Sequence, residues 1–414
     1  MDLKNNLIKE AIVGENTYCV SPWNEAHVNM FGKIRFCCQH KGINANVKSV
    51  TLKQAFFGSD EYRLARKQVM TNVWPEGCQQ CTRSEKSQKY STRIDNYNAF
   101  ISNPSLKKDF GTRLQNIGID FGNSCNLRCT MCDPHKSTGW MKDAKLLENK
   151  LGIEVRRAIQ LQKQPGLGWQ EGLEYGLPMD FVDKNIDMLL QATNIKCGGG
   201  EPFYMPQFIG MVDKLIEHGF KGHLSIITNM TLLKDDIVKK LKKLPSVTLI
   251  VSIDGINHLY PYMRPSTPFG KYKGQTIQDN IVKYQEDFQI GLSYTPQLMN
   301  VYNIKEYIGW VEENMHRKGR WSDHFNQSVN DPRYLRISVH PDLAYKNKLA
   351  NWIETTQQSN EVFDALVFQL RIEPSEKDIN DWKFFCKTID ILDKHRKTSI
   401  LKYIPELEKY WIKA

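Results

Sequence analysis

Short apolar runs alternate with amphipathic stretches between residues 113 and 345. This alternation predicts parallel strands joined by helical crossovers, so we expect an α/β fold with a partial (β/α)6 TIM-like barrel. Functional side chains should then lie at the carboxyl ends of the strands. We expect strands near 115–120, 194–198, 223–229, 246–254, 291–299 and 335–340, with helices such as 206–218, 233–243 and 304–316 between them.

The segments on either side of this barrel have different patterns. Residues 26–31 and 33–36 alternate and predict a hairpin turning at Gly32, which brings Cys19 and Cys37 towards the same end. We therefore expect three parts: a cysteine-rich N-terminal domain, a barrel and a helical C-terminal extension. Their predicted bounds are 1–112, 113–345 and 346–414, with C-terminal helices near 344–356, 360–370, 376–392 and 399–410.

One connection is longer than a crossover needs. It lies between Cys132 and Gly198 and contains the Pro- and Gly-containing stretch 164–169. Long loops of this kind are often functional, so we expect this one to line a substrate entrance.

Composition narrows the class of protein. The 414 residues are 41% hydrophobic and 25% charged, which is ordinary for a soluble globular chain. The N-terminus lacks the apolar core of a secretory signal and no apolar run is long enough to span a bilayer, so we expect a cytoplasmic protein and no membrane partner. The net charge of +10 suits a polyanion, but the Lys and Arg are scattered. The basic stretch 239–243 is most simply a solvated helix end, so nucleic-acid binding is not favoured.

The chain has ten cysteines, and in a reducing compartment these indicate metal ligands or buried thiols. Cys125, Cys129 and Cys132 fall within eight residues, directly after the expected first barrel strand. Three thiolates at this spacing suit three irons of a four-iron cluster and leave the fourth iron open, as a catalytic metal centre does. A chance cluster or a zinc knuckle is the alternative.

Further polar groups follow the next three strands. Adjacent glycines let the backbone close on a ligand, and a carboxylate suits an ammonium group. Polar side chains at strand ends fit hydrogen bonds to a ribose and a carboxylate, although Thr, Asn and Asp also cap helices there. The candidates are Gly199, Gly200, Glu201, Thr228, Asn229, Ser252 and Asp254.

The cysteine spacing resembles the signature of the radical S-adenosylmethionine (SAM) enzymes, with Met131 in place of the usual aromatic residue. The resemblance implies that the open iron binds SAM, that Gly199, Gly200 and Glu201 hold its methionine amine, and that Arg264 pairs with its carboxylate. Thr228-Asn229 resembles the family's Thr-Asn-Gly. Four residues on the fifth and sixth strands would then face the substrate: Thr295, Gln297, Asn300 and His340. His340 is either an acid or base near neutral pH or a structural histidine.

A second cysteine group lies in the N-terminal part. Cys19, Cys37 and the Cys-x-x-Cys pair Cys78 and Cys81 supply four thiolates, which close a site. Cys38 is a rival to Cys37, and zinc held by four cysteines is a rival to iron and sulfur. The pattern resembles the SPASM/twitch auxiliary-cluster domains, although those normally follow the barrel and carry further cysteines. Cys197 and Cys386 are expected to be buried thiols.

Together these resemblances imply a radical SAM enzyme that forms a 5′-deoxyadenosyl radical at a [4Fe-4S] cluster and abstracts hydrogen from a peptide or protein. The implied cofactors are that cluster, SAM and a second, auxiliary [4Fe-4S] cluster. The implied partners are the substrate and an external electron donor such as flavodoxin or ferredoxin. The alternatives are a sugar, nucleotide or other small-molecule substrate, or a non-catalytic iron–sulfur or zinc protein that binds nucleic acid.

Overall fold

The computed structural model describes residues 9–88, 91–158, 175–266, 270–317, 320–329 and 331–413. Its internal contacts divide the chain into two compact units. Unit 1 consists of Met1–Asn123, Tyr175–Ile227 and Leu233–Thr248, and unit 2 of Ser124–Glu174, Thr228–Leu232 and Leu249–Ala414. This division does not follow the bounds expected from the sequence, because both units contain parts of the expected barrel.

The strands of unit 1 belong to a mostly parallel sheet. The N-terminal hairpin is confirmed, since β1 (Glu25–Val28) pairs antiparallel with β2 (Ile34–Arg35). β1 also pairs in parallel with β3 (Asn116–Asp120), so the N-terminal region shares the barrel sheet. β4 (Asn194–Gly198) and β5 (His223–Thr228) follow in parallel.

The full strand order is β2-β1-β3-β4-β5-β6-β7, and the division between the units passes through β6 (Val247–Ser252). In unit 1, Leu224 N donates to Ser246 O just before β6, at 3.0 Å; in unit 2, Ile253 N donates to Ser293 O of β7 (Gln289–Ser293), at 3.1 Å. The predicted α/β class with a parallel sheet is confirmed.

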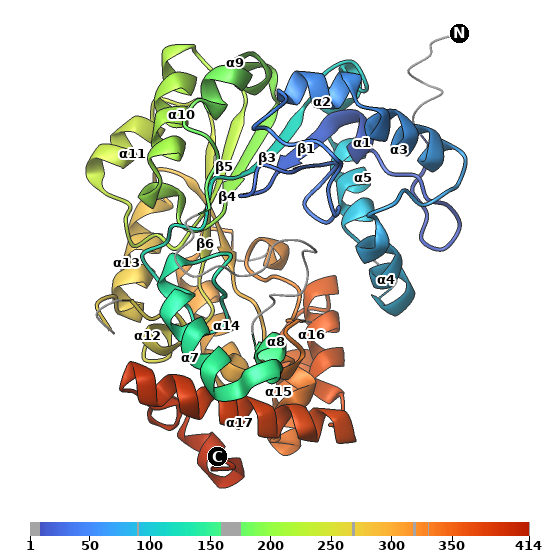
Figure 1. The fold of residues 1–414 in the computed structure, drawn as a ribbon. Coiled ribbons are helices and arrows are strands. Elements are labelled where there is room, and N and C mark those ends of the chain that lie inside the picture. The colour runs from blue at the N-terminus through green and yellow to red at the C-terminus, as the bar shows by residue number, and fades with distance from the viewer. Residues whose placement is uncertain are drawn as a thin grey trace. The chain divides into compact units, whose positions relative to one another are not determined.

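Amphipathic helices cover one side of strands β3 to β5 in unit 1 (Figure 1). They are α9 (Phe181–Gln191), α10 (Pro206–Glu217) and α11 (Asp235–Leu241). α10 begins with a proline at its first turn, where the missing N–H costs nothing, and buries Phe208, Met211, Val212 and Leu215. These helices make the crossovers that parallel strands require.

The N-terminal part of unit 1 is otherwise helical. Its helices are α1 (Ser21–Asn24), α2 (Leu52–Gly58), α3 (Asp60–Met70), α4 (Gln79–Gln88), α5 (Thr92–Ser102) and α6 (Pro104–Lys108). α2 starts at a capping box of Thr51 and Gln54. A small apolar core that includes Tyr18, Trp23 and Phe100 joins α1, α3, α5 and α6.

Unit 2 combines the cysteine loop with most of the C-terminal half. Its first helices are η1 (Thr138–Trp140), α7 (Met141–Leu151), η2 (Gly152–Glu154) and α8 (Val155–Ala158). Then come α12 (Tyr260–Met263), α13 (Gly274–Tyr284), η4 (Leu298–Asn303), α14 (Ile304–Asn314), η5 (Trp321–Asp323), η6 (Arg333–Leu335) and η7 (Ile337–Val339). The last elements are α15 (Leu343–Thr356), α16 (Glu361–Arg371), α17 (Glu376–Arg396), η8 (Ile400–Lys402) and η9 (Pro405–Tyr410).

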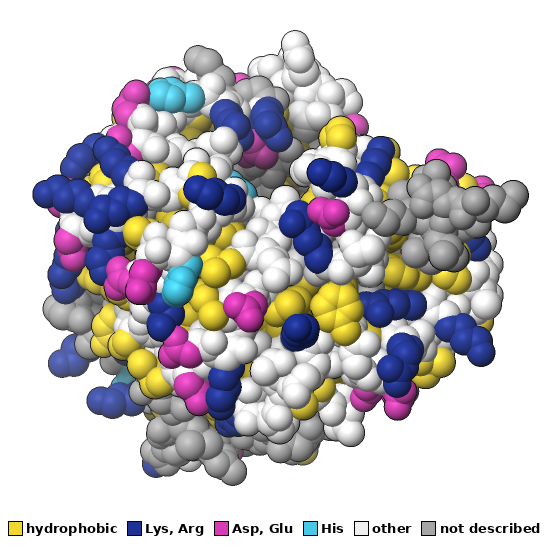
Figure 2. Space-filling model, turned by 90° about the horizontal axis from the view of Figure 1, so that it is seen from above, with side chains coloured by type: hydrophobic (Ala, Val, Ile, Leu, Met, Phe, Trp, Pro, Cys, Tyr) yellow, Lys and Arg dark blue, Asp and Glu magenta, His cyan; other side chains and the backbone are white. Residues whose placement is uncertain are grey.

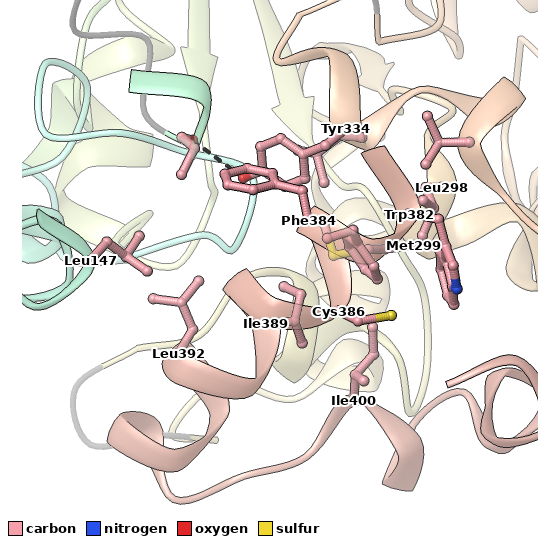
Figure 3. Packing of buried hydrophobic residues seen from close by; sticks show 14 of the residues in the cluster. Leu147, Leu298, Met299, Tyr334, Trp382, Phe384, Cys386, Ile389, Leu392 and Ile400 are labelled. Carbon is pink, nitrogen blue, oxygen red and sulfur yellow. Dashed lines mark hydrogen bonds between the residues drawn. The ribbon is translucent and has the colours of Figure 1, made fainter. Parts of the chain in front are cut away.

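Helix α17 runs through the largest part of the unit 2 core. A capping box of Ser375 and Asp378 starts it, and Lys397 in the left-handed conformation ends it. Its buried side chains pack against α7, η4 and η6, as Figure 3 shows for Leu392 and Leu147 and for Phe384 and Tyr334. Burial of many large apolar side chains fixes this helix firmly.

Three sequence expectations for unit 2 are wrong in part. Residues 335–340 form no strand: η6 and η7 fill this region, because each turn satisfies its own backbone through bonds such as His340 N to Ile337 O at 3.0 Å. The strand near 291–299 ends at Ser293. The helix expected over 399–410 is two 3-10 segments, η8 and η9, with Pro405 starting the second.

The loop expected at 164–169 lies outside the described residues. Among the helices that the structure describes, none is both long and apolar enough to cross a membrane.

Candidate active site

The loop that holds Cys125, Cys129 and Cys132 is fixed by its backbone. Arg128 N donates to Pro265 O at 2.9 Å and Thr130 N donates to Met263 O at 2.8 Å. Leu127 forms an isolated bridge with Ser266. The three cysteines therefore lie on a loop whose backbone is bonded to the end of α12 and to the residues after it. Arg264 belongs to this second segment.

Two of the three sulfurs lie beside hydrogen-bond donors, and Cys132 Sγ lies 3.6 Å from an acceptor, Asp133 O. Cys125 Sγ lies 3.5 Å from Leu127 N and 3.9 Å from Asn229 Nδ2. Cys129 Sγ lies 3.6 Å from Arg264 Nη1. Donors aimed at sulfur stabilise a thiolate over a thiol and tune a metal centre that the thiolate holds.

The residues predicted at the end of β5 also lie at this loop. Asn229 Nδ2 donates to Asn126 Oδ1 at 3.0 Å, and Asn126 Nδ2 donates to Thr231 Oγ1 at 2.7 Å. Thr228 Oγ1 accepts from Met230 N at 2.9 Å, which closes the turn after the strand. Asn229 is thus tied to the first cysteine and its neighbour.

Asp254 and Arg264 form a buried ion pair beside Cys129. Asp254 is 3% exposed and accepts both from Arg264 Nη2 and from Thr295 N, the latter at 3.2 Å. Burial alone lowers the pKa of Arg264, but Asp254 and then Cys129 raise it, so the guanidinium stays charged. Ser252 ends β6 two residues before Asp254 and is half-buried.

Some buried polar atoms here have no hydrogen-bond partner among the described residues. They include Arg264 Nε and both amide atoms of Gln297. Buried polar groups are nearly always paired, so such atoms mark places where a bound molecule supplies the missing partner. Asn300 differs, because its Nδ2 donates to Asp254 O at 3.0 Å and to Thr295 O at 2.9 Å.

His340 is fully buried after η7. Burial, followed by the charge of Lys346, lowers its pKa to about 3, so the ring is neutral near pH 7. Its Nδ1 accepts from Asp342 N at 3.2 Å. This environment favours a structural role over acid or base chemistry near neutral pH.

The Gly199, Gly200 and Glu201 segment lies in unit 1, directly after β4. Gly199 has φ of +115°, and a Cβ there would lie 2.6 Å from Gly122 O, so only glycine fits. Gly200 N donates to Gly122 O at 2.7 Å. Glu201 is fully buried, and its carboxylate accepts from Phe203 N at 3.2 Å.

Residues 119–286, which contain the cysteine loop, Glu201 and Arg264, match the family model of the radical SAM superfamily. This segment of the chain is a radical SAM domain. This confirms the prediction of an enzyme of that superfamily, whose reaction is treated below as a proposal. None of the curated proteins matches the chain by sequence.

Solved radical SAM structures resemble the chain weakly. A structure of anSMEcpe with bound AdoMet and Cp18Cys peptide is 13% identical, with a TM-score of 0.37 over 58% of this chain and 60% of that one. SuiB of Streptococcus suis is 14% identical, with a TM-score of 0.32 over 82% of this chain and 72% of that one. The chain thus spans less than two thirds of the first structure. Both TM-scores lie below 0.5, so the likeness carries no further conclusion.

The chain has a second group of cysteines in unit 1. Cys19, Cys37, Cys78 and Cys81 all line one cavity, whereas Cys38 does not line it and is exposed. The hairpin carries Cys37, and α4 begins between Cys78 and Cys81. The geometry therefore favours Cys37 over Cys38 as the fourth member of the group.

Burial keeps these cysteines protonated unless a metal is present. It raises the pKa of Cys19 to about 11 and that of Cys78 to about 12, and it also raises those of Cys37 and Cys81. The same is true of Cys129 and Cys132 in unit 2. Buried thiols become thiolates when a metal supplies the compensating charge.

The cavity of the second group also has a buried ion pair at its wall. Arg93 lines the cavity and contacts Glu85, with 2.7 Å between Nη2 and Oε2, and its Nη1 donates to Tyr18 O at 2.8 Å. In the described part of the chain, no three His, Cys, Asp or Glu side chains converge closely enough to hold a single metal ion.

Sequence reasoning missed the residues behind the cysteine loop. Trp140 Nε1 donates to Cys129 O at 2.7 Å, and Thr130 lies between the second and third cysteines with a fully satisfied hydroxyl. Asp143 and Arg396 pair directly behind them. The aromatic and charged residue types alone carried no signal, because each is also common on ordinary helices.

Proposed function

We propose that Cys125, Cys129 and Cys132 hold a [4Fe-4S] cluster whose open iron binds SAM. The observation that best supports this proposal is the loop itself. Its three cysteines follow β3 within the segment that matches the superfamily, and Arg264 lies beside the sulfur of Cys129. When bound and reduced by one electron, the cluster supplies the reductive cleavage of SAM to methionine and a 5′-deoxyadenosyl radical, which takes a hydrogen atom from substrate.

The residues that match the family's motifs bind and orient SAM in this proposal. Glu201 and the backbone at Gly199 and Gly200 hold the methionine ammonium, and the free Nε of Arg264 meets the carboxylate. Asp254 fixes the direction of Arg264 through their ion pair. A planar guanidinium held from one side presents its remaining donors at a defined angle, which suits a carboxylate.

Polar side chains at the ends of β5 and β6 complete the proposed SAM site. Asn229, which already contacts Asn126 and Cys125, lies where the family places its Thr-Asn-Gly motif, and Thr228 precedes it. Ser252 is assigned to the same site. Buried walls around these groups exclude water, which protects a radical from side reactions.

We further propose that Cys19, Cys37, Cys78 and Cys81 hold an auxiliary [4Fe-4S] cluster, and that residues 1–112 form a twitch-like domain around it. The shared cavity and the exposure of Cys38 support this ligand set. Because four protein thiolates close the site, this cluster serves electron transfer, structure or substrate contact and does not bind SAM.

Iron analysis tests both assignments together. Anaerobically reconstituted protein should bind about eight irons and eight sulfides, and replacing Cys125, Cys129 and Cys132 together should halve that number. The remaining half should keep its visible absorption and lose any response to SAM. Four irons with one zinc, and a colourless triple variant, would show instead that the N-terminal site is a zinc module.

The proposed substrate class is a peptide or protein, because radical SAM enzymes with auxiliary clusters commonly act on such substrates. Electrons come from an external one-electron donor of the flavodoxin or ferredoxin type. The +10 charge does not favour a nucleic-acid partner, since Figure 2 shows Lys and Arg at many places on the face, with Asp and Glu between them. The distribution of charge on this face therefore does not favour the nucleic-acid alternative.

The deciding experiment is anaerobic incubation with SAM and dithionite, with 5′-deoxyadenosine measured by mass spectrometry. We expect 5′-deoxyadenosine to form, and to form faster when the substrate is present. Reconstituted protein that holds iron but makes none would refute the proposed reaction.

A further inference from the structure

The last residue of α17, Arg396, is a buried cation behind the cysteine loop. Its side chain is 2% exposed and that of its partner Asp143, on α7, is fully buried. Arg396 Nη2 lies 2.8 Å and Nε 3.3 Å from Asp143 Oδ2. Arg128, from the cysteine loop, has its Nη1 3.8 Å from Asp143 Oδ1. A buried guanidinium and carboxylate held this closely fix the elements that carry them.

Arg396 also reaches into the cysteine loop. Its Nη1 donates to Thr130 Oγ1 at 3.2 Å, and the Thr130 hydroxyl donates to Tyr262 O at 2.7 Å. Tyr262 OH in turn donates to Asp393 Oδ1 at 3.1 Å, and Asp393 lies one turn before Arg396 on α17. The contacts form a closed ring that begins and ends on one helix.

A second route leads from Arg396 to Cys129. The guanidinium lies over the Trp140 ring, 5.1 Å from its centroid, and Trp140 Nε1 donates to Cys129 O at 2.7 Å. Arg396 thus supports the carbonyl of Cys129 through Trp140, and it contacts the next residue, Thr130, directly. The core packing of α17 makes the helix a rigid support for both contacts.

We propose that Arg396 is a positioning residue for the cysteine loop, through which the C-terminal helix sets the backbone of Cys129 to Cys132. This inference rests on the proposed function, because it assigns the loop to the cluster. Arg396 touches neither cysteine sulfur. It acts through Thr130, Trp140 and Asp143, and groups that orient metal ligands in this way commonly change metal affinity or activity about 10- to 100-fold when removed.

The principal variant is Asp143→Asn with Arg396→Gln. Replacing both partners removes the two buried charges together; Arg128 also loses Asp143, but its side chain is 15% exposed to water, so the loss of stability is limited. The matched control is Asp381→Asn with Arg333→Gln. Asp381 lies on the same helix, and Arg333 donates to it from η6, but neither residue is among the contacts of the cysteine loop described above.

A second pair of variants keeps the test open if the double variant does not fold. Thr130→Ser keeps the hydroxyl that links Arg396 to Tyr262 O, and Thr130→Val removes it at nearly the same volume. We expect Thr130→Ser to behave as the natural protein and Thr130→Val to behave as the principal variant.

Hydrogen exchange of the peptide that contains residues 125–132 is measured first, in protein without clusters. We expect about tenfold faster exchange in the principal variant and no change in the control. After reconstitution, the principal variant should lose SAM-cluster iron or form 5′-deoxyadenosine at least about tenfold more slowly, while the N-terminal iron is retained.

Equal exchange and equal activity in the principal variant and the control would overturn the proposal. Failure of the proposed function is a different outcome: natural protein would then form no 5′-deoxyadenosine, although the exchange experiment still reports on the loop. Loss of thermal stability with an unchanged loop, iron content and turnover would show that Arg396 serves the core alone and would also overturn the proposal.

Discussion

The ion pair between Asp254 and Arg264 gives a prediction whose size follows from burial. Asp254→Asn keeps the shape of the side chain and removes its charge. The side chains of Asp254 and Arg264 are 4% and 12% exposed, so the substitution leaves a buried guanidinium beside the neutral thiol of Cys129. Breaking a buried pair by removing one partner costs about 3 to 5 kcal/mol.

The lower end of that range is expected here. The new amide oxygen can still accept from Thr295 N, as the carboxylate does at 3.2 Å, so one hydrogen bond survives. For a unit of roughly 200 residues, each 1 kcal/mol lowers the unfolding midpoint by roughly 2 to 4 °C, so about 3 kcal/mol corresponds to roughly 6 to 12 °C.

Circular dichroism of cluster-free protein measures the midpoint of Asp254→Asn, Arg264→Gln and the double variant. The double variant should regain part of the stability, because no unpaired charge remains, but it should bind SAM no better than the single variants. Glu354→Gln, which breaks the exposed pair with Arg371, is the control and should cost less than about 1 kcal/mol. Midpoints for Asp254→Asn equal to that control, or a double variant less stable than either single one, would refute the reasoning.

Three further predictions concern single residues. Cys129→Ala should abolish 5′-deoxyadenosine formation and leave the protein folded, because the cluster needs all three thiolates; unchanged turnover would remove this loop from the site. Glu201→Gln should weaken SAM binding by about 1 to 3 kcal/mol in calorimetry, since Gln keeps the acceptor for Phe203 N and loses the charge, whereas Glu217→Gln at the exposed end of α10 should have no effect. Lys346 is buried, and burial lowers its pKa to about 8. Between pH 8 and about 10 the lysine is therefore protonated in the unfolded chain and largely neutral in the folded one, so the stability due to Lys346 should rise with pH across this window. Urea titrations of the natural protein and Lys346→Met at pH 7.5 and 9.5 check this, and a pH dependence that is the same in both would contradict it.

The sequence predicted the elements that local pattern determines. β3 and β4 appear where buried apolar residues alternate with more exposed positions, as the period of a strand requires, and β5 has a longer buried run. The hairpin at Gly32 follows from a turn residue between two alternating segments, and Gly32 has φ of +80°. The cysteine groups were visible for a similar reason, since ligands close in the chain form part of a site whatever the rest of the fold does.

The sequence also suggested the right neighbours for the first cysteine loop, although not their contacts. Asn229 and Arg264 were expected near SAM, and the structure brings them to Cys125 and Cys129. The choice of Cys37 over Cys38 needed the structure, because both follow β2 in a bend and turn, and only the fold shows that Cys37 lines the cavity and Cys38 is exposed.

Tertiary structure alone decided which distant segments meet. β1 pairs with β3 across most of the N-terminal region, and an apolar pattern shows that a strand is buried but does not name its partner. Residues 335–340 are apolar enough for a strand, yet they pack on α17 as 3-10 turns because their backbone groups are satisfied locally. Arg396 looks like an ordinary cation at a helix end, where the helix dipole favours one, and only the packing of α17 against α7 brings it to Thr130. Contacts of this kind depend on chain topology and on close packing, and neither can be inferred from the spacing of residues along the sequence.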